Sequence, residues 1–345
     1  MHVRHCIVSA PGKAILHGEH AVVHGKVALA VSLNLRTYLE LKATSTGKVS
    51  IDLPNIDTFL SWDLSDLQPL VSESFAKPDE AQRLDPELLG RLREFVGVAD
   101  GNLDTRSMAT LAFLYIYLSL FGSGWCQEDM ELINSWAFQG ERIIHGNPSG
   151  VDNAVGTWGG MLRFLSGKII PLSRVPLLRI LLTNTKVPRS TKQLVAGVKD
   201  KLTKFPSIIN PVLDSVDAIS CTCEKTLAEM TSEPITGEHY NVLEELIDIN
   251  QSQLCVLGVG HPSLDTLCRV TLTHGLHSKL TGAGGGGCGI TLLRPETDAA
   301  VVRDTVRDLQ ACGYDCWETS IGGPGVQQHG APSVREDILE RLGPR

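Results

Sequence analysis

The sequence predicts a two-domain protein of mixed helices and strands, with an α/β first domain and an α+β second domain. Its 345 residues exceed the size at which one hydrophobic core usually stops growing, about 250–300 residues. Apolar residues make up 42% of the chain and charged residues 20%, which allows large cores. Long helical patterns mixed with strands follow residue 178. We therefore expect one domain over residues 1–175 and another over 176–345.

The first half of the chain combines strand and helix patterns. Runs rich in Val and Leu, or alternating with polar residues, are typical of strands. Such runs lie at residues 5–9, 27–35, 37–41 and 49–53. Helices are expected at residues 86–98, 105–120 and 128–144, and a turn-rich loop at 145–153.

The second half is dominated by helical patterns. A buried strand is expected first, at residues 178–183. Helices are then expected at residues 191–204, 210–232, 238–257 and 263–274. After a glycine-rich loop, the patterns predict a strand at 289–293, a helix at 297–312 and a strand at 314–319. This mixture favours an α+β second domain.

One uncharged segment, residues 107–126, imitates a membrane span. Its dense apolar part, residues 108–121, is shorter than the ~20 residues that a helix needs to cross a bilayer. A glycine-containing stretch at 122–124 follows it. A buried core helix is therefore the expected structure.

Charge and cysteine content exclude several classes of protein. The formal net charge of −8 argues against binding to nucleic acids or to membrane surfaces, which both need a basic field. The net charge does not exclude an anionic small ligand, because a pocket can be locally positive in an acidic protein. The nine cysteines form no CxxC pair, and their odd number favours a reducing compartment over a disulfide framework. A zinc site at Cys221 and Cys223 is not expected, because positions i and i+2 of a helix face different ways.

The strongest local signal is the glycine-rich loop at residues 278–289. It contains a G-x-G-x-x-G match at Gly282, Gly284 and Gly287, but the predicted order of helix, loop and strand differs from that of a dinucleotide site. No Gly-Lys-Ser/Thr sequence ends the loop, so it is not a P-loop. Glycines permit positive φ angles and close backbone approach. The loop is a tight turn against another loop, a neighbour of a ligand, or both if the neighbouring loop binds phosphate.

Four polar residues stand out, each with a structural alternative. Lys13 follows a predicted strand end, where catalytic groups are common, although a lone lysine is usually a solvated charge. His20 could be a turn residue with a satisfied hydrogen bond. Glu141 lies on a helix expected to be largely buried, where it needs an ion-pair partner or a metal. Asp152 could be a general base or a helix N-cap.

Four stretches together resemble the mevalonate kinase family, within the galactokinase, homoserine kinase, mevalonate kinase and phosphomevalonate kinase superfamily. They are residues 9–25, which contain Gly-Glu-His-Ala-Val-Val-His-Gly, 141–153, which contain His-Gly-Asn-Pro-Ser-Gly-Val-Asp-Asn, 183–189 and 279–289. The match runs over nearly the whole chain, and the two strings are highly specific together. The resemblance implies a two-domain α+β small-molecule kinase fold, with an N-terminal domain like ribosomal protein S5 and a ferredoxin-like C-terminal domain.

The resemblance implies ATP-dependent phosphorylation of the 5-hydroxyl of mevalonate, with Mg²⁺, in isoprenoid and sterol biosynthesis. By carry-over, Asp152 takes the proton from the hydroxyl, while Lys13 stabilises the alkoxide, holds Asp152 ionised and binds the nucleotide. Glu141 is implied as a magnesium ligand, and Asn55 is implied near ATP. The residues implied on the mevalonate side are Glu19, His20, Ser149, Arg189 and Thr191.

The chain departs from the family pattern at one place. Family members carry a second glycine-rich motif, Pro-x-Gly-x-Gly-Leu-Gly-Ser-Ser-Ala, whose N–H groups and helix dipole bind the ATP phosphates and one of whose serines binds Mg²⁺. It should fall between Leu120 and Gln127, where this chain has only residues 121–126. The first domain therefore looks truncated near 120–127, by several tens of residues in one block.

We expect this loss to weaken both folding and catalysis. A domain has only ~5–15 kcal/mol of net stability, and burial of one large apolar side chain contributes ~1.5–3 kcal/mol. A missing strand and helix would remove several such contributions and unpair a sheet edge. The uncharged helix at 107–126 is then expected to lose its cover and to favour aggregation.

Three hypotheses for the function remain. The first is a mevalonate kinase impaired by an internal deletion, and the second is a non-catalytic mevalonate-binding or dimer-partner variant. The third is a dinucleotide-dependent oxidoreductase, against which the predicted order of loop and strand argues. The resemblance also implies a homodimer, feedback inhibition by prenyl diphosphates, and a cytoplasmic or peroxisomal setting.

Overall fold

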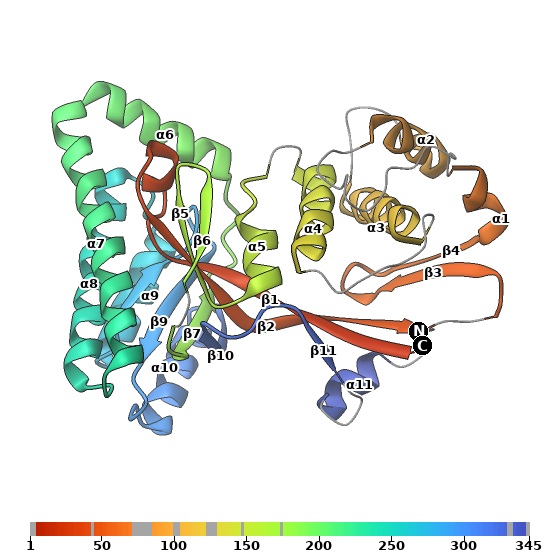
Figure 1. Ribbon diagram of the computed structural model, residues 1–345. Coiled ribbons are helices and arrows are strands. Elements are labelled where there is room, and N and C mark those ends of the chain that lie inside the picture. Colours follow the sequence, from red (N-terminus) through yellow and green to blue (C-terminus); the bar gives the residue numbers. More distant parts are fainter. Residues whose placement is uncertain are drawn as a thin grey trace. The chain divides into compact units, whose positions relative to one another are not determined.

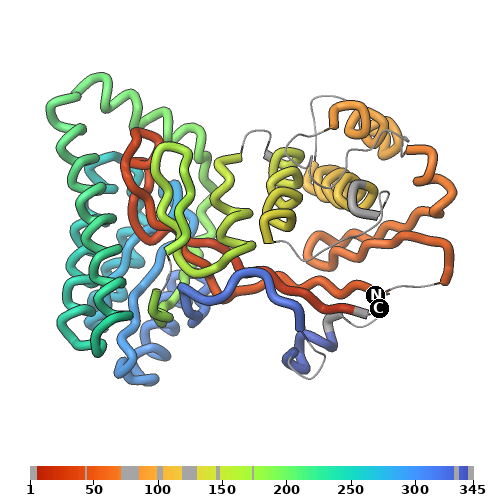
Figure 2. Tube along the Cα trace, in the orientation of Figure 1, coloured from red at the N-terminus to blue at the C-terminus, as the bar shows by residue number. Residues whose placement is uncertain are grey.

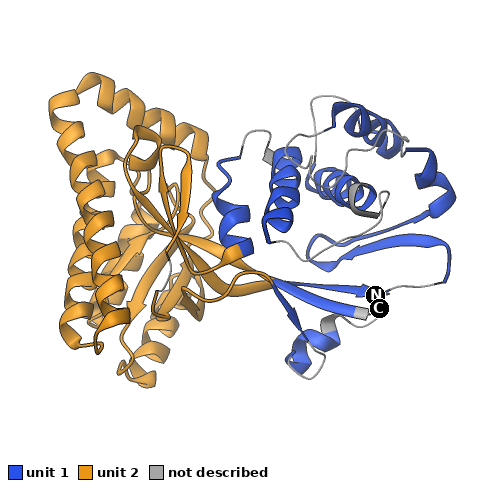
Figure 3. Ribbon diagram, in the orientation of Figure 1, with its two compact units in different colours: residues 1–9, 38–157, 327–345 blue, residues 10–37, 158–326 orange. Residues whose placement is uncertain are grey.

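A computed structural model describes residues 5–42, 45–70, 85–98, 104–121, 130–145, 148–172, 175–329 and 334–342. The chain divides into two compact units, coloured separately in Figure 3. The first unit combines residues 1–9, 38–157 and 327–345, and the second combines residues 10–37 and 158–326. These units are discontinuous in sequence because the first strands contribute residues to both of them. A division into domains at residue 175 stays a prediction.

The second unit contains an antiparallel sheet in which β2, β10, β7, β9 and β8 are neighbours in that order. β5 pairs with β2, and β6 pairs with β5. The strands of the larger of the two described sheets are β1 (His5–His17), β2 (Ala28–Lys42), β5 (Met161–Leu165), β6 (Lys168–Pro171), β7 (Leu178–Asn184), β8 (Ser278–Leu280), β9 (Cys288–Leu293), β10 (Asp315–Ile321) and β11 (Gln327–His329).

Helices cover both faces of this sheet. The helices of this unit are η1 (Ala21–His24), α6 (Thr191–Lys204), α7 (Pro206–Ser232), α8 (Gly237–Leu257), α9 (Pro262–Thr273) and α10 (Ala299–Ala311), of which η1 and α6 pack against α7. Ile180 packs in one core cluster with Leu227 of α7 and Ile247 of α8. The next residue, Leu181, packs in another cluster with Leu267 of α9. Because successive strand residues face opposite ways, the continuous apolar run of β7 fits a strand covered on both sides.

The long helices α7 and α8 form an antiparallel pair, which the ribbon and the Cα trace both show (Figures 1 and 2). α6 has the predicted bounds, whereas α7 begins at Pro206 rather than at residue 210 and continues through Pro211. Pro206 is tolerated because the first turn of a helix has no partner for its N–H groups.

The first unit holds a hairpin and a group of helices. Its elements are β3 (Lys48–Leu53), η2 (Pro54–Ile56), β4 (Thr58–Asp63), α1 (Leu64–Leu67), η3 (Gln68–Leu70), α2 (Pro86–Val96), α3 (Thr105–Phe121), α4 (Met130–His145), α5 (Val151–Trp158) and α11 (Glu336–Leu342). The last residue of α5, Trp158, belongs to the second unit. Here β11 pairs with the start of β1. Leu111 and Leu114 of α3 are fully buried against α2 and α4.

The uncharged helix is therefore covered, and the expectation that it would lose its cover is wrong for the described part of α3. No helix in the described ranges has the length and apolar character needed to cross a membrane. The region of the expected truncation, 120–127, lies mainly outside the described residues.

Some predicted boundaries were wrong. β1 continues past Pro11 and Gly12 to His17, so Lys13 lies inside the strand rather than after it. Gly12 suits this continuation, because a Cβ there would make a tight contact, 3.3 Å, with the carbonyl oxygen of Leu35 in the neighbouring strand. The two strands expected at 27–35 and 37–41 are one strand, β2. The expected loop at 145–153 ends earlier, because α5 begins at Val151.

Candidate active site

A tight turn after β1 carries Glu19 and His20 into the interior of the second unit. The turn begins with Gly18, whose φ is +93° and whose added Cβ would lie 2.3 Å from the carbonyl oxygen of Val27. Only glycine fits so close to the backbone of the next strand. Glu19 and His20 are 3% and 6% exposed. His20 has a φ of 60°, and such strain in a non-glycine residue is typical of functional sites.

Glu19 forms a fully buried ion pair with Lys279 of β8. The Lys279 ammonium donates to Oε1 of Glu19 and, over 2.8 Å, to the carbonyl oxygen of Leu280. Oε2 of Glu19 is buried and has no hydrogen-bond partner among the described residues. Burial raises the pKa of Glu19, and the positive charges of Lys279 and Lys13 oppose that rise. Burial likewise lowers the pKa of Lys279, and Glu19 opposes that fall.

His20 presents a second buried acceptor. Its Nε2 lies 2.7 Å from the carbonyl oxygen of Ala283, which can only accept, so Nε2 carries the proton. Burial lowers the pKa of His20, which favours the neutral ring. Nδ1 then has a free lone pair, and it is buried without a hydrogen-bond partner in the part of the chain that the structure describes. Glu19 and His20, neighbours in the chain, thus each offer one buried acceptor that has no partner among the described residues and that a ligand or water can satisfy.

The glycine-rich loop joins β8 to β9 and packs against neighbouring loops. The hydroxyl of Thr281 accepts from the Ile15 N–H at 3.0 Å and donates to the Ile15 carbonyl at 2.9 Å. The N–H of Gly285 donates to Val259 at 2.7 Å, and that of Gly287 donates to Val187 at 3.1 Å.

These contacts confirm the tight-turn interpretation of the loop, and they engage two of its N–H groups. The expected helix before the loop is α9, but a short strand that was not predicted, β8, lies between them, because residues 278–280 pair with β9. The loop therefore links two antiparallel strands. This geometry excludes the strand, loop and helix of a dinucleotide site.

Arg189 lies at the other end of the same loop. Thr185 binds the Gly287 carbonyl through its N–H and its hydroxyl, both at 2.8 Å. The Arg189 guanidinium packs so closely on Gly287 that an added Cβ would lie 1.5 Å from Nη1. Thr191 is the first residue of α6, where Ser190 caps the helix. The glycine loop thus contacts both Arg189, at Gly287, and the Glu19–His20 turn, at Ala283.

A half-open pocket of about 340 Å³ adjoins this loop. Its lining includes Arg189, Ser190, Gln193, Leu194, Lys201 and Gly285. The two cationic side chains in this lining, Arg189 before α6 and Lys201 in its last turn, suit an anionic group of a small ligand.

The remaining predicted residues lie in the first unit. Glu141 is half-buried on α4, and Asp152 is an exposed residue in the first turn of α5. The N-cap alternative for Asp152 is wrong, because the helix begins one residue earlier; the Ser149 hydroxyl contacts the first N–H at 3.4 Å. The side-chain amides of Asn134 and Asn153 lie 2.7 Å apart and join α4 to α5.

Several of the predicted contacts among these site residues stay predictions. Glu141 and Asp152 both have polar partners and lie on adjacent helices of the first unit. Lys13 belongs to the second unit, so its pairing with Asp152 stays a prediction. Asn55 is exposed in η2, between β3 and β4, and its proximity to ATP also stays a prediction.

Sequence reasoning gave no role to Lys279, although a signal for one exists. Lys279 is the only charged residue in the stretch 278–293, which is otherwise apolar or glycine-rich. A lone charge in a segment predicted to be buried requires a partner. His17 and Asn250 were also missed; their side chains lie 3.2 Å apart in the same interior.

Comparison with known proteins identifies the family. Residues 236–311 match the family model described as GHMP kinases C terminal. The chain is 51% identical to mevalonate kinase of Bos taurus over 389 aligned positions, which cover 97% of this chain and 98% of that protein. It is also 51% identical to mevalonate kinase of Homo sapiens, with the same coverage of both chains. Since 389 aligned positions exceed the 345 residues of this chain, the bovine protein has residues that this chain lacks.

Solved structures agree at the level of the fold. The Methanococcus jannaschii mevalonate kinase has a TM-score of 0.64 at 20% identity, covering 92% of this chain and 99% of that chain. The L. major mevalonate kinase in complex with R-mevalonate also has a TM-score of 0.64 at 20% identity, covering 92% of this chain and 96% of that chain. With identity of about half over nearly its whole length, this chain belongs to the mevalonate kinase family.

Proposed function

We propose that this chain binds mevalonate beside the Glu19–His20 turn and transfers a phosphoryl group from ATP to its 5-hydroxyl. Family membership at 51% identity supports the reaction class. The observation that carries the proposal is the pair of buried acceptors, Glu19 Oε2 and His20 Nδ1, which have no hydrogen-bond partner among the described residues. Hydroxyl groups of a ligand would supply the missing donors.

The chemistry of mevalonate matches the surroundings of this turn. Mevalonate carries hydroxyl groups and one carboxylate. The hydroxyls suit Glu19 and His20, and the carboxylate suits the guanidinium of Arg189, which packs on the same glycine loop. Ser149 and Thr191 are further proposed substrate contacts. The structural neighbour from L. major was solved with R-mevalonate, which is consistent with this assignment.

The proposed chemistry assigns one task to each remaining residue. Asp152 would accept the proton of the 5-hydroxyl, Lys13 would stabilise the resulting alkoxide and hold Asp152 ionised, and Asn55 would contact the nucleotide. Phosphoryl transfer depends mainly on such positioning and charge neutralisation.

Mg²⁺ would neutralise charge on the phosphates of ATP and would be held by Glu141. No cluster of three or more His, Cys, Asp or Glu side chains suited to a metal occurs among the described residues. A single carboxylate such as that of Glu141 fits Mg²⁺, which is usually bound by one or two carboxylates together with substrate phosphates and water.

We further propose that phosphoryl transfer by this chain is slow. The bovine relative has residues that this chain lacks, and no second glycine-rich phosphate motif is found in the sequence. The remaining glycine loop already uses the N–H groups of Gly285 and Gly287 in contacts with other loops. The same observations support a second candidate function, mevalonate binding without turnover.

A coupled assay of ADP release tests the proposed reaction. We expect mevalonate-dependent ADP release and phosphomevalonate as the product, at a rate well below that of the bovine relative, and Asp152→Asn should abolish it. Galactose and homoserine serve as control substrates. Release of ADP with either control but not with mevalonate would contradict the proposal, whereas mevalonate binding without turnover would favour the second candidate.

A chimera tests the cause of the slow rate. Residues 122–127 are replaced by the segment that the bovine relative carries between the same flanking sequences. We expect the rate to rise strongly while mevalonate affinity changes little, because Glu19, His20 and Arg189, the main proposed contacts, lie in the second unit. An unchanged rate in a folded chimera would argue against a deletion as the cause. A homodimer, feedback inhibition by prenyl diphosphates and a cytoplasmic setting remain proposals that rest on family resemblance.

A further inference from the structure

We infer that Lys279 is a positioning residue for the substrate, because it holds one oxygen of Glu19 and thereby leaves the other facing the ligand. This inference rests on the proposed binding of mevalonate at Glu19 and His20. Lys279 and Glu19 are separated by most of the chain, yet their side chains are both 0% exposed and in direct contact. The pair therefore sets the orientation of a carboxylate in the site.

Lys279 is itself firmly held. It lies in the three-residue strand β8, which pairs with β9. The N–H of the next residue, Leu280, donates to Oε1 of Gln251 in α8 at 2.8 Å. The ammonium also donates to the Leu280 carbonyl at 2.8 Å. With its backbone and ammonium both fixed, Lys279 can fix the carboxylate that it binds, and Glu19 cannot rotate without breaking a buried charged hydrogen bond.

Other groups around the pair cannot replace Lys279. His17 of β1 faces it, and burial lowers the pKa of His17 to about 3. Cys223 of α7 and Cys268 of α9 also face it, and burial raises the pKa of each thiol to about 12. All three groups are therefore uncharged near neutral pH. Lys13 also acts on the charge of Glu19, but the contact with Oε1 is made by Lys279.

Loss of Lys279 should change what Glu19 offers to a ligand. Burial already favours the protonated form of Glu19, and the positive charge of Lys279 opposes this. Without the lysine, the carboxyl group would become protonated and free to rotate. A ligand hydroxyl would then lose an oriented anionic acceptor, although the fold around it could persist.

Calorimetric titration of R-mevalonate into four variants tests this role. The variants are Lys279→Met, Glu19→Gln, the double variant with both changes, and the control Lys26→Met, which removes an ion pair with Asp214 that is partly exposed. We expect Lys279→Met to weaken mevalonate binding at least about tenfold in the wild-type background. In the Glu19→Gln background the same change should have no further effect, because Lys279 acts through Glu19.

A pH series adds a readout that a purely structural role would not move. Mevalonate affinity of Lys279→Met should recover as pH rises, because Glu19 ionises again, whereas the unsubstituted protein should show no such recovery over the same range. If Lys279→Met does not fold, the comparison of Glu19→Gln with the double variant, which buries no unpaired charge, decides the matter. Equal affinities of these two support the inference.

Two failures can be told apart. If the unsubstituted, folded chain does not bind mevalonate, the proposed function is wrong and this role of Lys279 falls with it. If that chain binds mevalonate but Lys279→Met weakens binding by the same factor with and without Glu19, Lys279 supports only the structure, and the inference alone is overturned.

Discussion

At the scale of single residues, the site depends on glycines that let the backbone approach side chains closely. Gly18 allows the turn that buries Glu19 and His20, and Gly287 leaves room for the guanidinium of Arg189. An added methyl group at Gly287 would collide with the flexible end of Arg189 rather than with backbone. The guanidinium can move away, so the cost would fall on ligand binding more than on folding.

A matched pair of glycine substitutions tests this distinction. Gly287 and Gly282 have φ angles of +71° and +79°, but nothing lies within 4 Å of an added Cβ at Gly282. Both Gly287→Ala and Gly282→Ala should lower the free energy of unfolding by about 1–2 kcal/mol, the cost of a left-handed non-glycine residue. Only Gly287→Ala should also weaken mevalonate binding, by about tenfold, through displacement of Arg189. Equal losses of affinity in a calorimetric titration would contradict the assigned role of Arg189.

The lowered pKa of His17 predicts how the free energy of unfolding depends on pH. Its pKa is lowered from 6.5 to about 3, because burial and then the charge of Lys279 disfavour the protonated ring, while the hydrogen bond to Asn250 partly opposes this. Below pH 6.5 the unfolded chain binds a proton at His17 that the folded chain does not. Stability is therefore complete above pH 6.5 and falls as pH is lowered towards 3.

Urea unfolding at several pH values measures this effect. His17 should contribute up to about 1.4 kcal/mol of lost stability per pH unit. In His17→Gln this part of the slope between pH 6.5 and pH 4 should disappear, even if the variant is less stable at pH 7. Parallel slopes in the two proteins would show that His17 is not held neutral in the folded state.

Only some of the residues of the candidate site could be predicted from the sequence. The strings around Glu19, His20 and Asp152 were recognised from the sequence, whereas the role of Lys279 was missed because its partner lies far away in the chain. The cap alternative for Asp152 failed because local patterns do not fix the first residue of a short helix.

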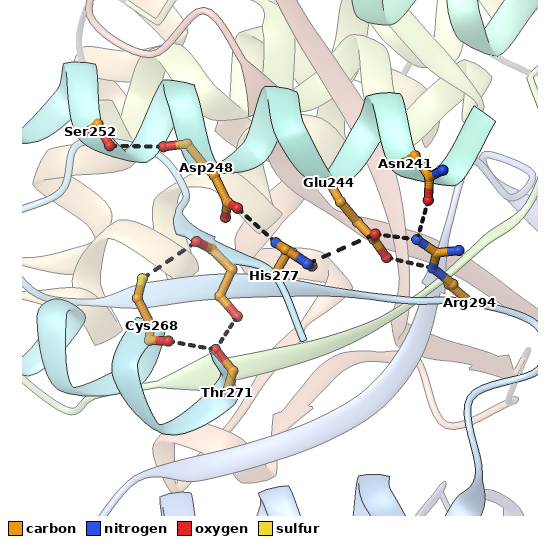
Figure 4. Close-up of polar contacts among 9 residues, drawn as sticks. Asn241, Glu244, Asp248, Ser252, Cys268, Thr271, His277 and Arg294 are labelled. Atoms are coloured by element: carbon orange, nitrogen blue, oxygen red, sulfur yellow. Dashed lines mark hydrogen bonds and ion pairs between the residues drawn. The ribbon is translucent and has the colours of Figure 1, made fainter. Parts of the chain in front are cut away.

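At the scale of elements, α8 binds the residue before β8 and the residue after β9, at the end of this hairpin that lies away from the glycine loop. His277 directly precedes β8, and its Nδ1 lies 2.7 Å from Asp248, as Figure 4 shows. Arg294 directly follows β9; its Nε donates to Glu244 at 2.8 Å and its Nη2 to Asn241 at 2.7 Å. These contacts fix the strands from which the glycine loop and Lys279 project.

Loss of the central carboxylate should loosen this anchor. The Glu244 side chain is only 11% exposed and binds Arg294 through both of its oxygens. Glu244→Gln should lower the free energy of unfolding by about 1.5–3 kcal/mol, because it removes charged hydrogen bonds from a poorly hydrated site. Asp304→Asn is the control, since Asp304 pairs with Arg307 on the surface and should cost about 0.5 kcal/mol or less. Similar losses in urea unfolding of both variants would contradict an anchoring role for α8.

The sequence predicted the long helices better than the strands, for a physical reason. Long amphipathic helices such as α6 and α8 follow from local periodicity, because one face of each is buried along its whole length. The continuity of β1 and β2 and the short β8 depend on pairing with distant strands, which no local pattern reveals.

At the scale of the whole molecule, the second unit holds the proposed mevalonate contacts Glu19, His20, Arg189 and Thr191, while Ser149, Asp152 and Glu141 belong to the first. Sequence similarity identified the reaction class, but only the structure showed that a buried ion pair and a glycine loop unite three distant segments. A second pocket, of about 390 Å³, lies between α7 and α8 and is lined by Glu229, Glu233 and Glu238. Its negative charge is unfavourable for mevalonate, which makes it an internal control.

Thermal unfolding tests which substrate the folded chain recognises. Saturating mevalonate should raise the melting temperature, because it binds only the folded state. ATP should raise it less, because the phosphate motif is absent from the sequence. Equal protection by both ligands would contradict an impaired nucleotide site, and protection by ATP alone would contradict the mevalonate site.

Hydrogen–deuterium exchange with and without R-mevalonate tests the central claim most directly, namely that Glu19, His20, the glycine loop and Arg189 form one ligand site. The account predicts that mevalonate slows exchange together in residues 15–21, 185–194 and 278–288, with no change in the acidic pocket at 226–242. Slower exchange confined to 226–242, or to segments outside these three, would contradict it.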